Sequence, residues 1–143
     1  MSITLLASVP ALGSAGTVKA HARALQGRSC VVIDSPVPLR VDLDAMLAAH
    51  EASGALLTVG VRPRRADDEG VDVLIADDEG RVIGVQPAPH PDEVLSDLVD
   101  AGIYVVSPAA LDHVGPAPAR LGSDLLPSLL GWDAAVHVHA MSG

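Results

Sequence analysis

Two histidines near the end of this 143-residue chain have a spacing that could suit a metal. His137 and His139 alternate along an apolar run, so on a strand they would share one face, and imidazole is a common zinc ligand. The pair has no cysteine nearby and no third ligand in the surrounding sequence. We therefore interpret these histidines as part of an exposed strand face.

The other reactive or charged clusters have simpler structural interpretations. Cys30 begins the apolar run Cys30–Ile33 and has no local histidine to activate it, so we expect a small buried side chain. Arg62–Arg65 could hold a phosphate, but Asp67–Glu69 follow at once and indicate a solvated charged loop. Asp77–Glu79 lack the spacing of a calcium-binding loop and indicate a turn.

Composition limits the classes of protein to which the chain can belong. Its 18 acidic and 9 basic residues give a net charge of −9, which argues against nucleic acid as a partner, because a basic surface is needed to neutralise phosphates. No apolar run approaches the roughly 18 residues of a membrane span, and no basic segment precedes Ile3–Ala7 as in a signal peptide. We expect a cytoplasmic protein without a membrane partner.

The first half of the chain alternates apolar runs with helical segments, in the β-α-β rhythm typical of a mostly parallel sheet. Asp42 is a candidate N-cap of the second helix, and Gly54 ends it. The elements expected in this half are a strand at Ile3–Leu6, a helix at Thr17–Gln26, a strand at Cys30–Ile33, a helix from Asp42 to Ser53 and a strand at Ala55–Val61.

The second half contains a hairpin signal, because Asp77–Gly80 separates two short apolar runs. Ser123 is a candidate cap for the last helix. The elements expected here are strands at Val71–Ala76 and Arg81–Val85, a helix at Asp92–Val99, a strand at Ile103–Val106, helices at Pro108–Val114 and Ser123–Leu130 and a strand at Ala135–Ala140. The fold class predicted from both halves is a three-layer α/β domain with a mostly parallel sheet and a small antiparallel element.

Six segments, in this order along the chain, resemble motifs of one enzyme family. Leu12-Gly-Ser-Ala-Gly16 is similar to a Leu-Gly-Thr-Ala-Gly turn, and Asp100-Ala-Gly-Ile-Tyr-Val-Val106 is similar to an Asn-Ala-Gly-Ile-Tyr-Val strand. The family is that of the sugar-1-phosphate nucleotidyltransferases, such as the mannose-1-phosphate guanylyltransferases and glucose-1-phosphate thymidylyltransferases. The other resembling segments are Val31–Asp34, Asp42–Thr58, Asp77–Gly84 and Ser123–Pro127.

The resemblance implies a nucleotide-diphospho-sugar transferase-like, Rossmann-like fold, with residues 1–143 forming a single domain. It implies a reaction of a nucleoside triphosphate with a sugar 1-phosphate, giving a nucleotide sugar and pyrophosphate, with Mg²⁺ on carboxylates. The family's N-terminal Gly-rich loop would precede Met1, and its Tyr-Trp-x-Asp-Ile-Gly metal motif would follow Gly143. We therefore expect an incomplete domain, truncated at both ends.

The same resemblance indicates that the catalytic apparatus is altered. The metal-binding Asp of the family's Asn-Gly-Asp motif falls at Pro36, which cannot bind a metal. The phosphate-contacting Lys of its Glu-Lys-Pro motif falls within Val85–Pro87, where both charged residues are missing. We expect no catalytic and no metal-binding residue of the usual kind, so that Mg²⁺, the cofactor of the family, loses a ligand here.

Some binding residues of the family are matched. Asp100 stands where the family has Asn, which removes two donors and adds a charge that would repel a sugar phosphate. The Gly-rich turn after Leu12 fits an ordinary strand-to-helix turn equally well, and Asp34 could simply cap nearby N–H groups. The residues that the resemblance assigns to the nucleotide are Gly13, Ser14, Ala15, Gly16 and Asp34, and those assigned to the sugar are Asp100, Ala101 and Gly102.

The functional hypothesis is a nucleotidyltransferase-like protein of sugar-nucleotide metabolism, degenerate or truncated. The alternative is a non-catalytic regulatory or structural partner of an active homologue, and a third possibility is an unrelated α/β binding domain. A missing first βα unit would leave a strand edge uncovered. We therefore expect a homo-oligomer or pairing with a complementing chain.

Overall fold

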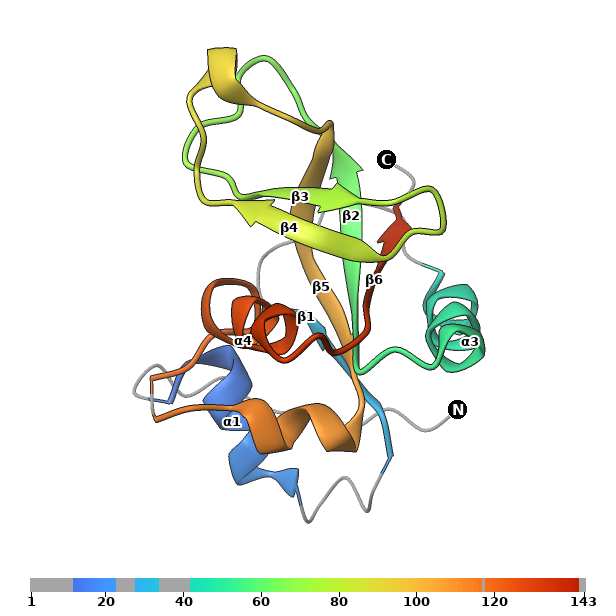
Figure 1. Cartoon of the computed structure of the whole chain (residues 1–143). Helices are drawn as coiled ribbons and strands as arrows, with labels where there is room; N and C mark the ends of the chain where they lie inside the picture. Colours follow the sequence, from blue (N-terminus) through green and yellow to red (C-terminus); the bar gives the residue numbers. More distant parts are fainter. Residues whose placement is uncertain (1–11, 23–27, 34–41, 117, 142–143) are drawn as a thin grey trace.

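The computed structural model describes residues 12–22, 28–33, 42–116 and 118–141, which form a mixed sheet with helices on both faces (Figure 1). Within these ranges the sheet has six strands in the order β4-β3-β5-β2-β6, with β1 paired to β5 beside this path. The strands are β1 (Cys30–Ile33), β2 (Leu57–Pro63), β3 (Val73–Ala76), β4 (Val82–Gln86), β5 (Leu98–Val106) and β6 (Val136–Ala140). The helical elements are α1 (Gly13–Ala20), α3 (Leu43–Ser53), η1 (Pro91–Glu93), η2 (Pro108–His113), η3 (Leu121–Leu125) and α4 (Leu126–Gly131).

The central strand β5 makes the sheet mostly antiparallel, so the predicted mostly parallel sheet is wrong. β5 is antiparallel to β1, β2 and β3, and β2 with β6 is the one parallel pair among the described strands. Cys30 of β1 and Leu57 of β2 both pair with Val106, from opposite sides. β1, α3 and β2 do follow the β-α-β order, but β5 returns from the β3–β4 hairpin and lies between the two strands.

Alternate side chains of β5 face two separate cores, which confirms that helices cover both faces of the sheet. Tyr104 and Val106 pack in a cluster with residues of α1, η2, η3 and α4. Ile103 and Val105 are fully buried on the other face, in a cluster that includes Met46 of α3. Both clusters are built mainly from aliphatic side chains.

Elements with strong local signals form as predicted. The Asp42 side chain accepts a hydrogen bond from Ala45 N at 3.0 Å and caps α3, and Gly54 ends the helix with φ +69°. The β3–β4 hairpin turns where expected, because Asp77 Oδ1 accepts hydrogen bonds from the N–H groups of Glu79 and Arg81. β1 occupies the predicted residues but is half-buried and not fully buried, since β5 is its one partner among the described strands.

Three predicted helical boundaries are wrong. α1 begins at Gly13, within the expected turn, and the Thr17 hydroxyl donates to Gly13 O at 2.7 Å. The helix expected at 92–99 is replaced by the short η1 and the start of β5, because the Gln86 amide bonds the backbone of Glu93 and Leu95 and holds that segment extended.

The last helical segment begins before Ser123, so that residue is not its cap. Ser123 lies inside the π-helical turn η3, whose N-cap is Arg120. The stabilising contact instead comes from Asp124, whose carboxylate accepts from Arg120 N at 2.8 Å. A carboxylate that bonds a free N–H group at a helix start acts as a cap from within the first turn.

The turn of the β3–β4 hairpin reaches the far edge of the sheet. Val138 N of β6 donates to Gly80 O at 2.9 Å, and Arg81 forms an isolated antiparallel bridge with His137. Arg81 also pairs with the Asp133 carboxylate at 3.2 Å. The hairpin therefore connects β4, at one end of the strand order, with β6 at the other.

No helix in the described part of the chain is long and apolar enough to cross a lipid bilayer.

Candidate functional site

The predicted nucleotide-side turn forms the first turn of α1 and packs on the segment before η3. Ala15 N and Gly16 N both donate to Ala119 O, at 2.8 and 3.1 Å. The buried Ser14 hydroxyl accepts from Leu121 N at 2.9 Å. These donors therefore bond the protein's own backbone, and a phosphate that used the same N–H groups would have to displace residues 118–121.

Gly13 allows this close approach. Its φ is +73°, and a Cβ at this position would lie 2.4 Å from Ala119 O. A residue with a side chain would be both strained and in collision with backbone. The glycine therefore determines how closely α1 packs on the segment that follows residue 117.

The predicted sugar-side residues lie on β5 where the strand bulges. Asp100 Oδ1 accepts from Gly102 N at 2.8 Å, and Asp100 Oδ2 accepts from the Tyr104 hydroxyl at 2.6 Å. Gly102 has φ +79°, and the register of β5 against β2 shifts between Val59 and Val61. Ala101 is buried in the core on the α3 face, so within this trio Asp100 and Gly102 have polar groups at the bulge.

Gly122 of η3 covers the Asp100 carboxylate. A Cβ on Gly122 would lie 2.8 Å from Asp100 Oδ2 and 3.0 Å from the Tyr104 hydroxyl. Residues 119–122 thus contact α1 on one side and β5 on the other. We call this region the α1–η3–β5 junction, comprising residues 13–16, 119–122, 100–102 and Tyr104.

The junction unites three segments that are distant in the sequence, and the resemblance had assigned two of them, 13–16 and 100–102, to a ligand. Ile33 pairs with Ile103, so the end of β1 lies next to Gly102. Asp34 and Pro36 lie outside the described residues. Tyr104 and Gly122 had no assigned role in the sequence interpretation. The only sequence signal for them was their position, in one matched strand and directly before another matched segment.

The Glu-Lys-Pro match at Val85–Pro87 has a structural role in this chain. The Gln86 side chain donates to Glu93 O at 2.9 Å and accepts from Leu95 N at 2.8 Å. Both ends of the amide therefore bond the backbone, where the family has a charged residue. The described residues contain no cluster of three or more histidine, cysteine or acidic side chains that could hold a metal.

His50 is a second buried polar centre, on the α3 face of the sheet. Its Nδ1 lies 2.7 Å from the Thr58 hydroxyl and its Nε2 2.6 Å from the Ser107 hydroxyl. Ser107 donates to Ala55 O, so it accepts from Nε2–H, and Nδ1 accepts from Thr58. Burial lowers the pKa of His50, Glu51 opposes this shift and His137 adds to it. A neutral imidazole satisfied on both nitrogens is a structural tie between α3, β2 and the end of β5.

His137, His139 and Cys30 carry no ligand geometry of their own. The two histidines share a face of β6, as expected, but they are half-buried and not exposed, because α3 packs on that strand. Cys30 is half-buried, and burial raises the pKa of its thiol to about 11, so a thiolate is disfavoured.

Two charged side chains at the end of β2 and in the loop after it are bonded to each other and largely buried. Arg62 forms two hydrogen bonds to the Asp68 carboxylate, at 2.9 and 2.7 Å, and the two side chains are 16% and 10% exposed. Asp68 also accepts from Arg65 N. The hydrogen bonds from Arg62 are the main reason that the pKa of Asp68 falls to about 2. This part of the prediction is therefore wrong for Arg62 and Asp68.

Sequence comparison places the chain among known proteins. No protein-family model matches the chain. Three curated proteins do: UTP–glucose-1-phosphate uridylyltransferase of Synechocystis sp. (28% identity over 84% of this chain), the bifunctional protein GlmU of Geobacter sulfurreducens (35% over 85%) and mannose-1-phosphate guanyltransferase of Schizosaccharomyces pombe (25% over 100%). The chain spans 32%, 26% and 39% of the lengths of these relatives, respectively. Over most of its length the chain is thus a distant homologue of the sugar-1-phosphate nucleotidyltransferases.

Proposed function

We propose that this chain is a non-catalytic nucleotidyltransferase-like domain that binds a sugar nucleotide or its precursors at the α1–η3–β5 junction. The observation that carries the proposal is that two matched segments, 13–16 and 100–104, converge there on residues 119–122. One relative is named for UTP and glucose 1-phosphate, and another for the transfer of a guanyl group to mannose 1-phosphate. In this proposal Gly13–Gly16 and Asp34 lie on the nucleotide side, and Asp100–Gly102 on the sugar side.

The loss of catalysis is proposed from two substitutions. Phosphoryl transfer requires cations to neutralise charge on the transferring group. Pro36 has no ligand atom for a metal in its side chain, and the Gln86 amide, where the family has charge, is neutral and bonded to the backbone. Transfer at this junction would therefore need groups from outside residues 1–143.

A second candidate function is that of a partner to an active homologue. It is favoured by β1, which among the described residues pairs on one side only and exposes 60% of Ile33. An open strand edge of this kind can accept a strand from a second chain. This second candidate function does not require a ligand at the junction.

The first experiment is calorimetric titration of the full chain with UTP, GTP, dTTP and the corresponding nucleotide sugars, with and without Mg²⁺. We expect saturable heat with at least one nucleotide sugar. Asp100→Asn should strengthen this binding, because removing one negative charge near a phosphate gains about 1 kcal/mol, or roughly fivefold in Kd. The matched control is Asp112→Asn, which removes an exposed carboxylate on η2 and should leave the titration unchanged.

Each outcome of that titration has a defined meaning. The absence of binding heat with every nucleotide and nucleotide sugar refutes the binding proposal and leaves the partner function. An effect of Asp112→Asn equal to that of Asp100→Asn would mean that binding follows net charge and not the junction. Pyrophosphate release from UTP and glucose 1-phosphate by the purified chain would overturn the proposed loss of catalysis.

A further inference from the structure

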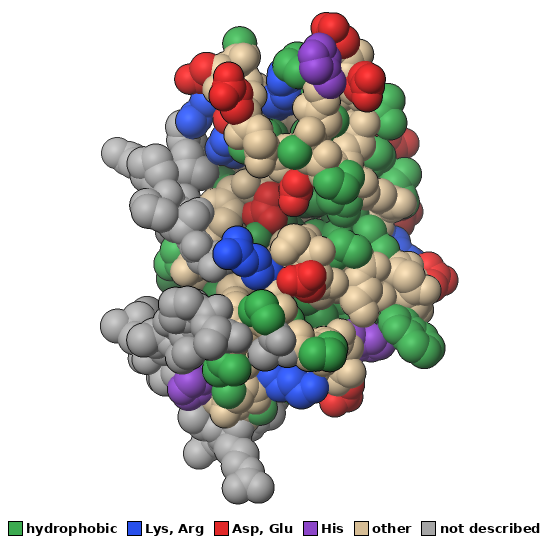
Figure 2. All heavy atoms as spheres, turned by 90° about the vertical axis from the view of Figure 1, so that its left-hand side faces the viewer, with side chains coloured by type: hydrophobic (Ala, Val, Ile, Leu, Met, Phe, Trp, Pro, Cys, Tyr) green, Lys and Arg blue, Asp and Glu red, His purple; other side chains and the backbone are tan. Residues whose placement is uncertain are grey.

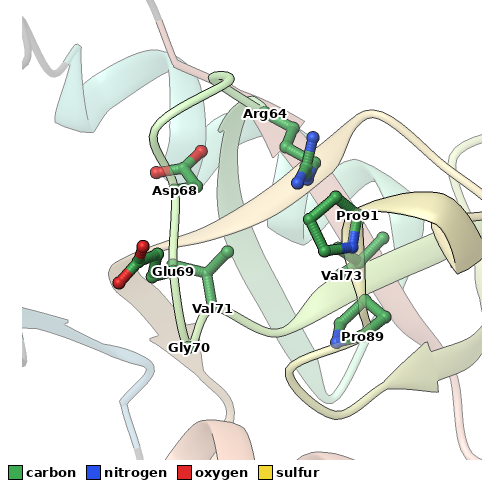
Figure 3. A pocket seen from close by; sticks show the side chains of 8 residues that line it. All are labelled: Arg64, Asp68, Glu69, Gly70, Val71, Val73, Pro89 and Pro91. Carbon is green, nitrogen blue, oxygen red and sulfur yellow. The ribbon is translucent and has the colours of Figure 1, made fainter.

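A small hollow lies between the loop after β2 and the loop after β4 (Figure 3). It shares no lining residue with the α1–η3–β5 junction, although Asp100 N donates to the backbone oxygen of Asp72, between the lining residues Val71 and Val73. Its volume is about 220 Å³, below the roughly 300–1,000 Å³ of pockets for drug-sized ligands. Only a small molecule fits. The residues that line it are Arg64, Asp68, Glu69, Gly70, Val71, Val73, Pro89 and Pro91.

Arg64 is the cation of this hollow. Its backbone is fixed, because Arg64 N donates to Asp97 O at 2.9 Å, and the residue is half-buried. Figure 3 shows the guanidinium extending toward Pro91, while the carboxylates of Asp68 and Glu69 point to the other side. Among the described residues no hydrogen bond or ion pair engages the Arg64 guanidinium, whereas the Asp68 carboxylate is already bonded by Arg62. The Arg64 guanidinium is therefore the one basic group that lines the hollow, and it has no bonded partner among the described residues.

Four of the lining residues are apolar: Val71, Val73, Pro89 and Pro91. Val73 is fully buried and Val71 is half-buried. Pro89 and Pro91 form one wall, with their φ angles restricted by the ring. Ala88 between β4 and this wall has φ +37° and is held by a hydrogen bond from its N–H to Asp72 Oδ1 at 3.1 Å. Because the proline rings and this hydrogen bond hold the wall in place, a ligand would not have to order it on binding.

The charge around the hollow selects among anions. Figure 2 shows acidic side chains gathered at the end of the molecule that carries these loops, with basic side chains between them. Asp68 and Glu69 are themselves part of the lining, and the whole chain has a net charge of −9. The acidic side chains repel a phosphate dianion more strongly than a carboxylate, because the dianion carries two negative charges and the carboxylate one. A carboxylate also matches the planar guanidinium of an arginine.

We propose that this hollow binds a small aliphatic monocarboxylate, whose carboxylate pairs with Arg64 and whose hydrocarbon part packs on Val71, Val73 and the two prolines. The site is separate from the α1–η3–β5 junction. It does not depend on the binding of a sugar nucleotide, so either proposal can fail without the other. A free carboxylic acid metabolite is the chemical class of ligand.

The test is an NMR titration of the full-length, ¹⁵N-labelled chain with 3-methylbutanoate as the probe. We expect saturable shifts of the Gly70 and Val71 amides and of the Arg64 side-chain N–H. The alcohol 3-methylbutan-1-ol has the same hydrocarbon part without the charge, and inorganic phosphate has the charge without the hydrocarbon part. Both should bind roughly tenfold or more weakly than 3-methylbutanoate, since each lacks one half of the recognition.

The decisive variant is Arg64→Gln, with Arg65→Gln as its matched control. Both arginines are in one loop, and the exposed Arg65 contributes its backbone N–H and not its guanidinium to Asp68. Arg64→Gln should weaken 3-methylbutanoate binding about tenfold, and Arg65→Gln by less than about twofold. Unchanged positions of the remaining amide signals show that each variant is folded.

Three results would overturn the proposal. They are the absence of saturable shifts at the Gly70 and Val71 amides, equal weakening by the two arginine substitutions, and binding of inorganic phosphate as tight as that of 3-methylbutanoate. The last of these would identify a general anion site. Tighter binding of 3-methylbutanoate by the wild type and by Arg65→Gln than by Arg64→Gln supports it.

Discussion

Gly122 provides a sharp test of how the α1–η3–β5 junction is packed. Replacing it by alanine places a Cβ 2.8 Å from Asp100 Oδ2, closer than real Cβ contacts, and 3.0 Å from the Tyr104 hydroxyl, tighter than most of them. The Asp100 carboxylate cannot rotate freely, because its other oxygen accepts from Gly102 N at 2.8 Å. The new methyl group must therefore break or stretch the 2.6 Å bond between Tyr104 and Asp100.

The size of the effect follows from that one bond. A hydrogen bond to a charged group contributes about 1.5–3 kcal/mol, and exchanging Gly for Ala in a helical segment returns about 0.5–1 kcal/mol. Gly122→Ala should therefore lower the free energy of unfolding by about 1–2 kcal/mol. Urea unfolding followed by circular dichroism measures this change. The control is Gly131→Ala at the end of α4, where nothing lies within 4 Å of the new Cβ and stability should stay level or rise.

Tyr104→Phe separates the proposed cause from general crowding. With the hydroxyl gone, the Tyr104–Asp100 bond is absent before and after the change, so Gly122→Ala in the Tyr104→Phe background should cost less than about 0.5 kcal/mol. The two substitutions should therefore be coupled by about 1 kcal/mol. Strict additivity, or a Gly122→Ala variant as stable as Gly131→Ala, would refute the account of the junction given above.

Further predictions concern backbone packing and pH. Gly13→Ala should cost about 2–4 kcal/mol, because it combines a positive φ with a backbone collision, while Gly115→Ala, which meets open space, should be near neutral in the same urea assay. His50 is neutral in the folded protein and burial lowers its pKa, so its contribution to stability is present above about pH 6.5 and is lost as the pH falls below that value. Urea midpoints measured from pH 8 down to about pH 5 should show this loss in the wild type and in a His90→Gln control, and not in His50→Leu. Asp68, with its pKa lowered to about 2, should contribute stability above about pH 4 that is lost as the pH falls toward 2, and Asp68→Asn should abolish this acid dependence and cost about 1–2 kcal/mol at neutral pH. An equal acid slope in the wild type and in Asp68→Asn would contradict the role given to that carboxylate.

Local features of the fold could be predicted from the sequence because their causes are local. Asp42 and Gly54 mark the ends of α3 through hydrogen bonds and backbone angles within a few residues. Asp77–Gly80 specifies the hairpin in the same way. Such signals do not depend on the rest of the molecule, and so these predictions were confirmed.

The direction and order of the strands depend on contacts between distant segments. Nothing near β1 or β2 indicates that β5 lies between them, and the β-α-β order of their sequence is compatible with direct neighbours. The start of β5 was predicted to be a helix. The side-chain hydrogen bonds of Gln86 to Glu93 and Leu95, which hold the segment after η1 extended, come from another strand and leave no local signal.

The junction shows a similar division. Gly13–Gly16 and Asp100–Gly102 could be named from matched motifs, and in the structure residues 119–122 contact both Gly13–Gly16 and Asp100. Gly122 could not, because its importance depends on a carboxylate 22 residues earlier that only folding brings beneath it. Whether these residues bind a nucleotide or a sugar stays a prediction.

The contact of the hairpin turn with β6 has a consequence for the order of events in folding. The β3–β4 hairpin is a short-range structure, whereas Gly80 and Val138 are separated by most of the second half of the chain. Their bond forms only after the last strand has docked beside β2. The Val138 amide should therefore acquire protection from hydrogen exchange late, in the same cooperative step that joins the two ends of the sheet, although one of its partners is among the first turns to form.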